Sequence, residues 1–205
     1  MKPRAVIVPS GGANYGSLAE ACRRVGVSAV VSGDPQRILD ATHVVLPGVG
    51  AAAHAMRSLR ASGLDRVLAR IAQPLLGICL GMQLLFDGSE EIDAAAGSGA
   101  GIECLGLLRG TVRRLPAAPN WPHMGWNTLH NRVEHPLLEG IGDRDWFYFV
   151  HGYAAQPNDD TLAASDHGDR FAAVVARGRV FGAQFHPEKS AAAGRRLLAN
   201  FFALA

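Results

Sequence analysis

Four short runs of consecutive apolar residues constrain the fold of this chain more than any other feature of its sequence. The runs do not alternate with polar residues, which is typical of strands that helices cover on both faces of a parallel sheet. A helical pattern over Leu18 to Val25 separates the first two runs, and a polar link precedes the third. The runs are Ala5 to Val8, Val27 to Val31, Val44 to Leu46 and Pro74 to Ile78. We therefore predict an α/β fold with a central, mostly parallel sheet flanked by helices.

The second half of the chain contains short β-prone segments between turn residues. The strands predicted there are Thr111 to Leu115, Trp126 to Leu129, Trp146 to Val150, Phe171 to Ala176 and Val180 to Phe185. Small residues over Ala94 to Gly101 predict a loop, and the pattern over Ala191 to Leu204 predicts an amphipathic closing helix. No repeat or linker divides the 205 residues, so we predict one domain, residues 1–205, with a strand-rich second half.

Charge and cysteine content argue against several classes of function. The 20 basic and 18 acidic residues give a formal charge of +2 with no long basic patch, so nucleic-acid binding is not indicated. The first apolar run is too short for a membrane span, and a cytoplasmic location is the default expectation. Three cysteines without a CxxC pair and eight histidines without a ligand-type spacing predict neither a disulfide framework nor a metal site. We expect no metal and no other cofactor.

The segment from Gly77 to Gly81 follows a predicted strand and opens a helix, with Cys79 at its centre. This is the setting of a nucleophile elbow, in which glycines on either side of the nucleophile avoid collisions with neighbouring elements. A helix N-terminus favours the thiolate, and the backbone N–H of Leu80 is placed to donate to an oxyanion. The alternative is that Cys79 is a small buried residue within a strand. The elbow alone does not decide between the two.

A second segment near the C-terminus supplies groups that would complement a cysteine nucleophile. His186 and Glu188 follow a predicted strand and are two positions apart, so in extended backbone their side chains share a face. Glu188 could therefore orient the His186 ring. Together with Cys79, they provide the nucleophile, base and orienting carboxylate of thiol-based acyl transfer. Alone, a histidine at a strand end is more often a surface or capping residue.

These residues carry a family resemblance. The segment Gly77 to Gln83, with Gln184 to Glu188, resembles the class I, triad-type glutamine amidotransferases. Three more segments, Leu46 to Gly50, Pro122 to Asn127 and Tyr148 to His151, resemble the branch that serves imidazole glycerol phosphate synthase in histidine biosynthesis, and the resemblance covers nearly the whole chain. It implies a flavodoxin-like amidotransferase fold and hydrolysis of glutamine to glutamate and ammonia through a thioester on Cys79.

The resemblance also implies roles around the nucleophile. A backbone N–H near Val49 would join that of Leu80 in the oxyanion site, although Pro47 to Gly50 could equally be a plain strand-to-loop turn. The residues matching glutamine-binding positions are Gly50, Gln83, Gly152 and Tyr153. The alternative for Gln83 is an ordinary amide on a helix surface. At Gly152 the chain departs from the family, in which a hydroxyl residue often follows the preceding histidine.

A partner surface is implied as well. The residues that match it are His123, Met124, Trp126, Tyr148 and Lys189. The partner would be a cyclase subunit with a (β/α)₈ barrel that forms a heterodimer with this chain and uses the ammonia to make imidazole glycerol phosphate and an aminoimidazole carboxamide ribotide. The turn over Pro9 to Asn14 is expected near this interface, and Trp126 and Tyr148 could instead be core aromatic residues.

Three other functions are left open by the sequence. The chain could serve a different synthase, of the anthranilate or aminodeoxychorismate type, although the segments Pro122 to Asn127 and Tyr148 to His151 argue against this. It could be an independent cysteine hydrolase, which Gln83 and the ending Gln184 to Glu188 disfavour. It could also be a binding or scaffold subunit without activity, which the presence of Cys79, His186 and Glu188 disfavours.

Overall fold

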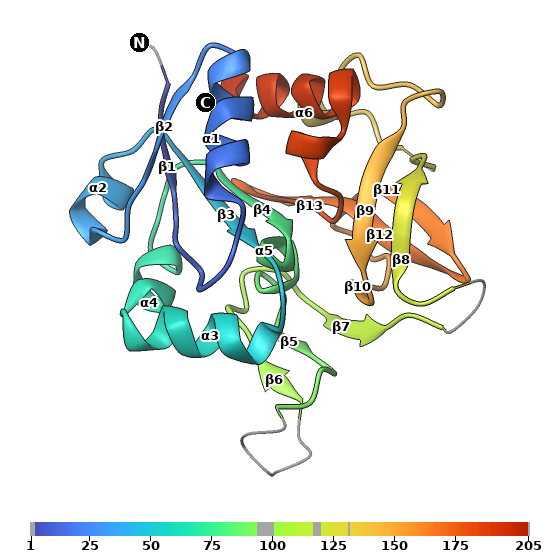
Figure 1. The fold of residues 1–205 in the computed structure, drawn as a ribbon, viewed down its shortest axis with the longest axis horizontal. Coiled ribbons are helices and arrows are strands. Elements are labelled where there is room, and N and C mark those ends of the chain that lie inside the picture. The colour runs from blue at the N-terminus through green and yellow to red at the C-terminus, as the bar shows by residue number, and fades with distance from the viewer. Residues whose placement is uncertain (1–2, 94–100, 117–119, 131, 205) are drawn as a thin grey trace.

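In the computed structural model the chain is built around a central sheet (Figure 1). The structure describes residues 3–93, 101–116, 120–130 and 132–204. Within these residues the sheet has seven strands in the order β11-β12-β13-β4-β3-β1-β2. The strands are β1 (Arg4–Ile7), β2 (Ser28–Val31), β3 (His43–Gly48), β4 (Leu75–Cys79), β11 (Thr161–His167), β12 (Asp169–Arg177) and β13 (Val180–Ala183). Neighbouring strands from β13 to β2 are parallel, and β11 and β12 extend the sheet antiparallel. The predicted mostly parallel sheet is confirmed.

Helices cover both faces of this sheet. On one side lie α1 (Tyr15–Arg24) and α6 (Ala191–Ala203), and on the other lie α3 (Ala52–Ala61) and α4 (Leu64–Leu68) (Figure 1). Alternate strand residues pack into two separate cores: Ile7 joins the core of α1 and α6, whereas its neighbour Val6 joins the core of α3 and α4. Both faces of β1 are therefore apolar, which explains why its sequence shows no alternation.

Two smaller sheets make up much of the second half. One has the order β10-β7-β5-β6, and the other is a hairpin of two strands. The strands are β5 (Gly88–Ser89), β6 (Ile102–Glu103), β7 (Thr111–Arg114), β10 (Tyr153–Ala155), and the hairpin strands β8 (His123–Asn127) and β9 (Phe147–His151). Two short 3₁₀ segments, η1 (Pro136–Leu138) and η2 (Pro187–Lys189), precede α6. The predicted closing helix and strand-rich second half are confirmed.

Several sequence-based boundaries were wrong. The polar link before the third run contains α2 (Pro35–Leu39), which begins with proline and has Asp34 as its capping residue. The helix after Cys79, α5 (Leu80–Gln83), is only one turn long. The strand expected from Trp126 begins instead at His123, and β10, β11 and the two helices α3 and α4 had not been predicted. Residues 94–100 of the predicted loop lie outside the described residues. None of the helices in the part of the chain described here has the length and apolar character needed to cross a membrane.

Close backbone packing holds the turn between β4 and α5. A Cβ atom built on Gly81 would lie 1.7 Å from the carbonyl oxygen of Leu46, and one built on Gly77 would lie 2.7 Å from Cα of Met82. The turn is thus pressed against β3 on one side and against its own helix on the other. The steric role predicted for the two glycines is confirmed. Backbone atoms set the limit at Gly81, and the backbone of Met82 and the side chain of Leu85 set it together at Gly77.

Gly81→Ala should therefore destabilise the protein by roughly 4 kcal/mol or more, since backbone must move to admit the methyl group. Gly16→Ala is the matched control, because Gly16 lies in the first turn of α1 and its nearest neighbour would be 4.0 Å from the new Cβ. That control should be neutral or stabilise by about 0.5–1 kcal/mol. Urea unfolding measures both changes, and similar free energies for the two variants would contradict the packing argument.

Candidate active site

Cys79 ends β4 with φ 53° and ψ −114°, a conformation that non-glycine residues rarely adopt. The surrounding contacts impose this geometry, which turns the side chain away from the strand. Its Sγ lies 3.8 Å from the carbonyl oxygen of Val150 and 3.9 Å from the side-chain nitrogen of Gln184. Cys79 is therefore at an elbow and not in the middle of a regular strand. Because α5 is one turn long, few aligned peptide dipoles reach the sulfur, fewer than the sequence suggested.

His186 and Glu188 are buried and joined by a hydrogen bond of 2.8 Å between Nδ1 and Oε1. The carboxylate can only accept, so Nδ1 carries the proton and Nε2 is directed elsewhere. Two hydrogen bonds hold this loop: the N–H of His186 donates to the carbonyl of Tyr148 at 2.9 Å, and the Ser190 hydroxyl donates to the carbonyl of His186 at 2.7 Å. The predicted shared face of His186 and Glu188 is thus present.

Electrostatics favour a protonated His186. Burial by itself lowers the pKa of this ring, but the adjoining Cys79 sulfur and the Glu188 carboxylate outweigh burial and raise the pKa. The other two cysteines differ. Burial raises the pKa of Cys22 to about 12 and that of Cys104 to about 11, so both remain thiols near neutral pH. Cys79 is the cysteine whose sulfur adjoins the His186 ring.

One cavity of about 200 Å³ connects these groups. Its walls come from the ends of β3, β4 and β9, from α5 and β10, and from the loop that carries His186. The residues that line it are Val49, Gly50, Cys79, Leu80, Gln83, Glu91, Val150, His151, Gly152, Tyr153 and His186. Every residue predicted for the oxyanion site or for glutamine binding is in this set. Glu188 lies behind His186 and supports it from outside this cavity.

The parallel arrangement explains the convergence. Gly48 is paired with Cys79, and Ala183 with Ile78, so the carboxyl ends of β3, β4 and β13 meet at one edge of the sheet. Ligand sites of open α/β sheets form at such edges.

Comparison with known proteins gives the family. Residues 6–205 match the model described as glutamine amidotransferase class-I. The chain belongs to the class-I glutamine amidotransferases. It is 51% identical over 197 residues to "Imidazole glycerol phosphate synthase subunit HisH" of Xanthomonas campestris pv. campestris (strain 8004), covering 95% of this chain and 94% of that one. The protein of the same description from Dehalococcoides mccartyi (strain CBDB1) is 46% identical, over 97% of this chain and 96% of that one. A solved structure described as a glutamine amidotransferase superposes with a TM-score of 0.71 at 21% identity, covering 96% of each chain, and supports the fold.

In this amidotransferase the predicted oxyanion segment has a specific backbone arrangement. The N–H of Val49 donates to the carbonyl of Gly12 at 3.0 Å and is not directed at Cys79. Gly50 follows with φ +91°, a conformation that glycine adopts without strain. The N–H of Leu80 is at the first position of α5, where no carbonyl within the helix can accept it. An oxyanion site with two N–H donors would therefore require the peptide before Val49 to rotate.

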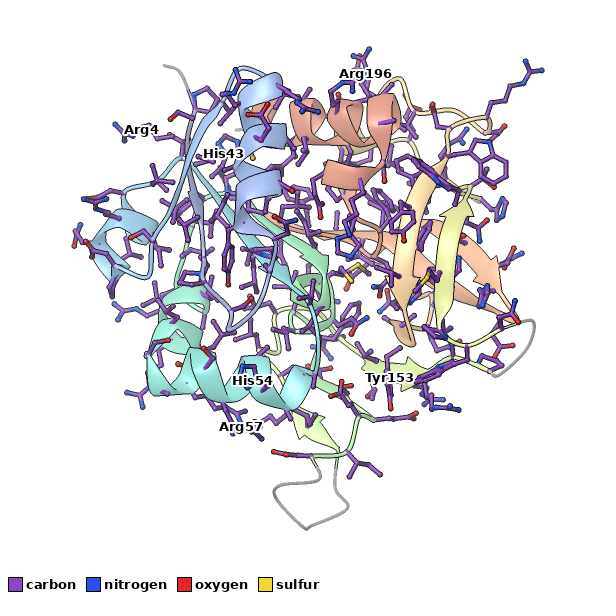
Figure 2. The ribbon with its side chains drawn as sticks, viewed as in Figure 1. Arg4, His43, His54, Arg57, Tyr153 and Arg196 are labelled. Carbon is purple, nitrogen blue, oxygen red and sulfur yellow. The ribbon has the colours of Figure 1, made fainter. Side chains whose placement is uncertain are left out.

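Gln83 is only 6% exposed, so it is not an ordinary amide on a helix surface. Its side-chain nitrogen donates to the carbonyl of Tyr153 at 2.8 Å and to the side-chain oxygen of Gln184 at 3.1 Å. Tyr153 is labelled in Figure 2 and lies beside β7, with which β10 pairs. Gln83 thus links α5 to two other parts of the cavity wall.

The departure at Gly152 also has a structural explanation. A Cβ atom there would lie 2.5 Å from the indole of Trp121, whose Nε1 donates to the Gly152 carbonyl at 3.0 Å. The guanidinium of Arg114 lies over this indole, 4.4 Å from a ring centroid. Trp121 therefore occupies the space that a side chain at position 152 would need.

Sequence reasoning missed three polar residues of the site. Glu91 lines the cavity, and its Oε2 accepts the N–H of Ala52 at 3.1 Å, which caps α3. His151 lines the same cavity, and Gln184 contacts both Cys79 and Gln83. Gln184 and His151 lie in segments that carry the family resemblance, and this could have indicated that they belong to the site. Glu91 follows a two-residue strand in a segment without a motif, so its position depends on the fold.

Some of the residues predicted for the partner surface lie together on the surface of the structure. Met124 and Trp126 are 64% and 50% exposed, and the Trp126 ring lies 5.9 Å from that of Tyr148. The ammonium group of Lys189 lies 5.6 Å from the Tyr148 ring centroid. His123 does not belong to this surface: it is 3% exposed, because alternate residues of β8 point inward. Trp126 is not a core residue. The turn over Pro9 to Asn14 adjoins the oxyanion segment, where Ser10 bonds the carbonyl of Pro47.

Glu188→Gln should lower the pKa of His186, because it removes the carboxylate that stabilises the imidazolium. NMR titration of the labelled His186 ring measures this change, with the exposed residue Glu134 changed to Gln as the control. For glutamine hydrolysis, His186→Asn should reduce kcat by about 10²–10⁴ and Glu188→Gln by less, because in the predicted triad His186 would transfer the protons and Glu188 would only orient the ring. An unchanged His186 titration in Glu188→Gln would contradict the electrostatic role of this carboxylate.

Proposed function

We propose that residues 1–205 form a single glutaminase domain that releases ammonia from glutamine, with Cys79 as nucleophile, His186 as acid and base, and Glu188 as its orienting carboxylate. The observation that carries the proposal is the cavity in which Cys79 and His186 meet the backbone groups of Leu80 and Gly50. A buried carboxylate on the far side of His186 completes the triad. Membership of the amidotransferase family supports glutamine as the substrate.

In the first half-reaction, the Cys79 thiolate attacks the side-chain amide carbon of glutamine. The carbonyl becomes an oxyanion that accepts from the N–H of Leu80 and, once its peptide has rotated, from that of Val49. Each such donor contributes about 10²–10³ in rate. The protonated His186 then gives its proton to the amide nitrogen, the C–N bond breaks and ammonia leaves. A glutamyl thioester remains on Cys79.

In the second half-reaction, neutral His186 takes a proton from water as the water attacks the thioester. The C–S bond breaks, glutamate leaves, and the thiolate and imidazolium are restored, so glutamine and water give glutamate and ammonia. The Glu91 carboxylate carries the charge needed to bind the α-ammonium group of glutamine. Gly50, Gln83, Gly152 and Tyr153 surround the rest of the amino acid in this proposal.

The partner follows from the relatives, which are described as subunits of imidazole glycerol phosphate synthase. We propose a cytoplasmic heterodimer with a cyclase subunit of (β/α)₈ barrel fold, docked on Met124, Trp126, Tyr148 and Lys189. Exposed aromatic residues at such density are typical of protein interfaces. The cyclase would use the ammonia to form imidazole glycerol phosphate and an aminoimidazole carboxamide ribotide. If the chain served another synthase, it would instead bind a different partner. If it were an independent hydrolase, it would need no partner.

Cys79→Ala should abolish glutamine-dependent synthesis by the complex but leave ammonia-dependent synthesis intact, because the partner's chemistry does not use the thiol. Both rates are measured with the same purified complex, once with glutamine and once with an ammonium salt. Cys22→Ala serves as the control, since this thiol is buried away from the cavity. Glutamine hydrolysis at more than a small fraction of the wild-type rate in Cys79→Ala would rule out the proposed mechanism.

The chain alone should hydrolyse glutamine poorly, because the Val49 N–H is bonded to Gly12. A partner that shifts the ratio of the rotated to the resting form of this segment from about 1:99 to 99:1 must bind the rotated form roughly 5.5 kcal/mol more tightly. Hydrolysis is to be compared for the chain alone, with partner, and with partner plus its substrate.

Gly50→Pro should reduce the stimulated rate because proline cannot adopt φ +91°. Lys189→Ala should weaken stimulation and spare the basal rate. Full activity of the chain alone would refute the gating.

A further inference from the structure

The inner face of the β8–β9 hairpin carries a line of hydrogen-bonded side chains outside the triad. Nδ1 of His123 lies 3.0 Å from Nε2 of His151, and Nδ1 of His151 lies 2.9 Å from the carbonyl oxygen of Tyr153. At the other end, the Asn127 amide nitrogen lies 3.4 Å from Nε2 of His123. The line therefore runs from β8, whose outer face bears Trp126, to the wall of the glutamine cavity.

The hydrogen bonds determine the tautomer of each ring. The carbonyl of Tyr153 can only accept, so Nδ1 of His151 is the protonated nitrogen and its Nε2 is an acceptor. His123 must then donate through Nδ1, which leaves its Nε2 to accept from Asn127. The Asn127 amide is itself oriented, because its oxygen accepts the N–H of Thr128 at 2.8 Å and its nitrogen donates to the carbonyl of Asp166 at 2.9 Å.

Both histidines are held neutral. Burial, together with a smaller effect of nearby histidines, lowers the pKa of His123 to about 4 and that of His151 to about 3. The His123 ring is stacked between Phe149 and His167, at centroid distances of 4.8 and 4.2 Å. A second proton on either ring would set two donors against each other. The line is thus intact throughout the neutral pH range and has one direction of donation.

The line ends on an atom that a substrate-binding residue also uses. The Tyr153 carbonyl accepts from His151 at 2.9 Å and from Gln83 at 2.8 Å. Tyr153, Gln83 and His151 all line the cavity. The loop that carries His186 is held by other contacts, through Tyr148, Ser190 and Glu188. The line therefore supports the glutamine-binding wall directly, and it reaches Cys79 only indirectly, through the contacts of Gln184 with Gln83 and Cys79.

We propose that His123 is a positioning residue for glutamine binding, which acts through the hydrogen bond from its Nδ1 to His151 and thereby fixes the Tyr153 carbonyl and Gln83. This inference rests on the proposed glutaminase function. It concerns the glutamine-binding wall of the same site, which β8 supports through His123. Since Met124 and Trp126 lie on the outer face of that strand, a partner docked there contacts the element from which the line begins.

The experiment is protection of Cys79 by glutamine against alkylation with iodoacetamide, followed by mass spectrometry. It needs no partner and no turnover, and the raised pKa of Cys22 and Cys104 keeps those thiols unreactive. His123→Phe keeps a stacked ring but removes the donor. It should raise the half-protecting glutamine concentration about tenfold, the equivalent of about 1.4 kcal/mol. The alkylation rate without glutamine should stay within about twofold, because other contacts hold the loop that carries His186.

Two variants separate the hydrogen bond from packing. His123→Asn loses the ring but places an amide donor near the position of Nδ1, so it should recover most of the affinity for glutamine. His167→Phe is the matched control, because it retains the stack on His123 and lies outside the line. It should behave as wild type. In the complex, His123→Phe should raise KM for glutamine and change kcat little.

Equal half-protection in His123→Phe and His167→Phe would overturn the inference. Equal losses in His123→Phe and His123→Asn would also overturn it, since the ring's packing would then be responsible. A parallel loss of alkylation rate without glutamine would do the same by indicating general damage. Failure of glutamine to protect wild-type Cys79 at any concentration would overturn the proposed function, and this inference with it.

Discussion

The close contact between the β4–α5 turn and β3 is the constraint on which the rest of the site depends. With no side chain at Gly81, the turn packs against the carbonyl of Leu46, and this contact determines where Cys79 sits relative to the oxyanion segment. Two residues before Gly81, Cys79 has the positive φ of 53°. Strain of this kind costs about 1–3 kcal/mol and persists only where the surrounding structure imposes it. Here β3, α5 and β13 impose it from three sides.

The β8–β9 hairpin is the second organising element, because it serves the surface and the cavity at once. Its outer side chains form the exposed group of Met124, Trp126 and Tyr148, whereas its inner side chains include His123 and His151. The backbone of Tyr148 also bonds the loop of His186. A strand whose side chains alternate between two faces couples these surfaces without any further structure. The predicted partner surface and the candidate site are thus two faces of one hairpin.

The buried histidines His186 and His151 have pKa values shifted in opposite directions, and the reason is physical. His186 has an anionic carboxylate on one nitrogen and the Cys79 sulfur nearby, and these raise its pKa. His151 is bonded to a neutral histidine and a backbone carbonyl, so burial dominates and lowers its pKa to about 3. Burial is common to both, and the charge of the hydrogen-bond partner decides the outcome. A neutral His151 leaves the cavity wall without a positive charge that would oppose the imidazolium.

The sequence by itself determined the parallel part of the sheet, the helices α1 and α6, the candidate triad residues and the family, because these depend on local periodicity and on motifs with fixed spacing. Through the resemblance it also indicated six of the residues that line the cavity: Val49, Gly50, Leu80, Gln83, Gly152 and Tyr153. Only the tertiary structure decided the rest. Glu91 joins the cavity from a segment without a motif, and Trp121 fills the space beside Gly152. His123 points inward although it lies in the predicted partner segment, since the pleat of β8 places alternate residues on opposite faces and sequence reasoning had begun that strand three residues too late. The state of the Val49 N–H depends on Gly12, far away in the chain, and such long-range contacts leave no periodic trace in a sequence.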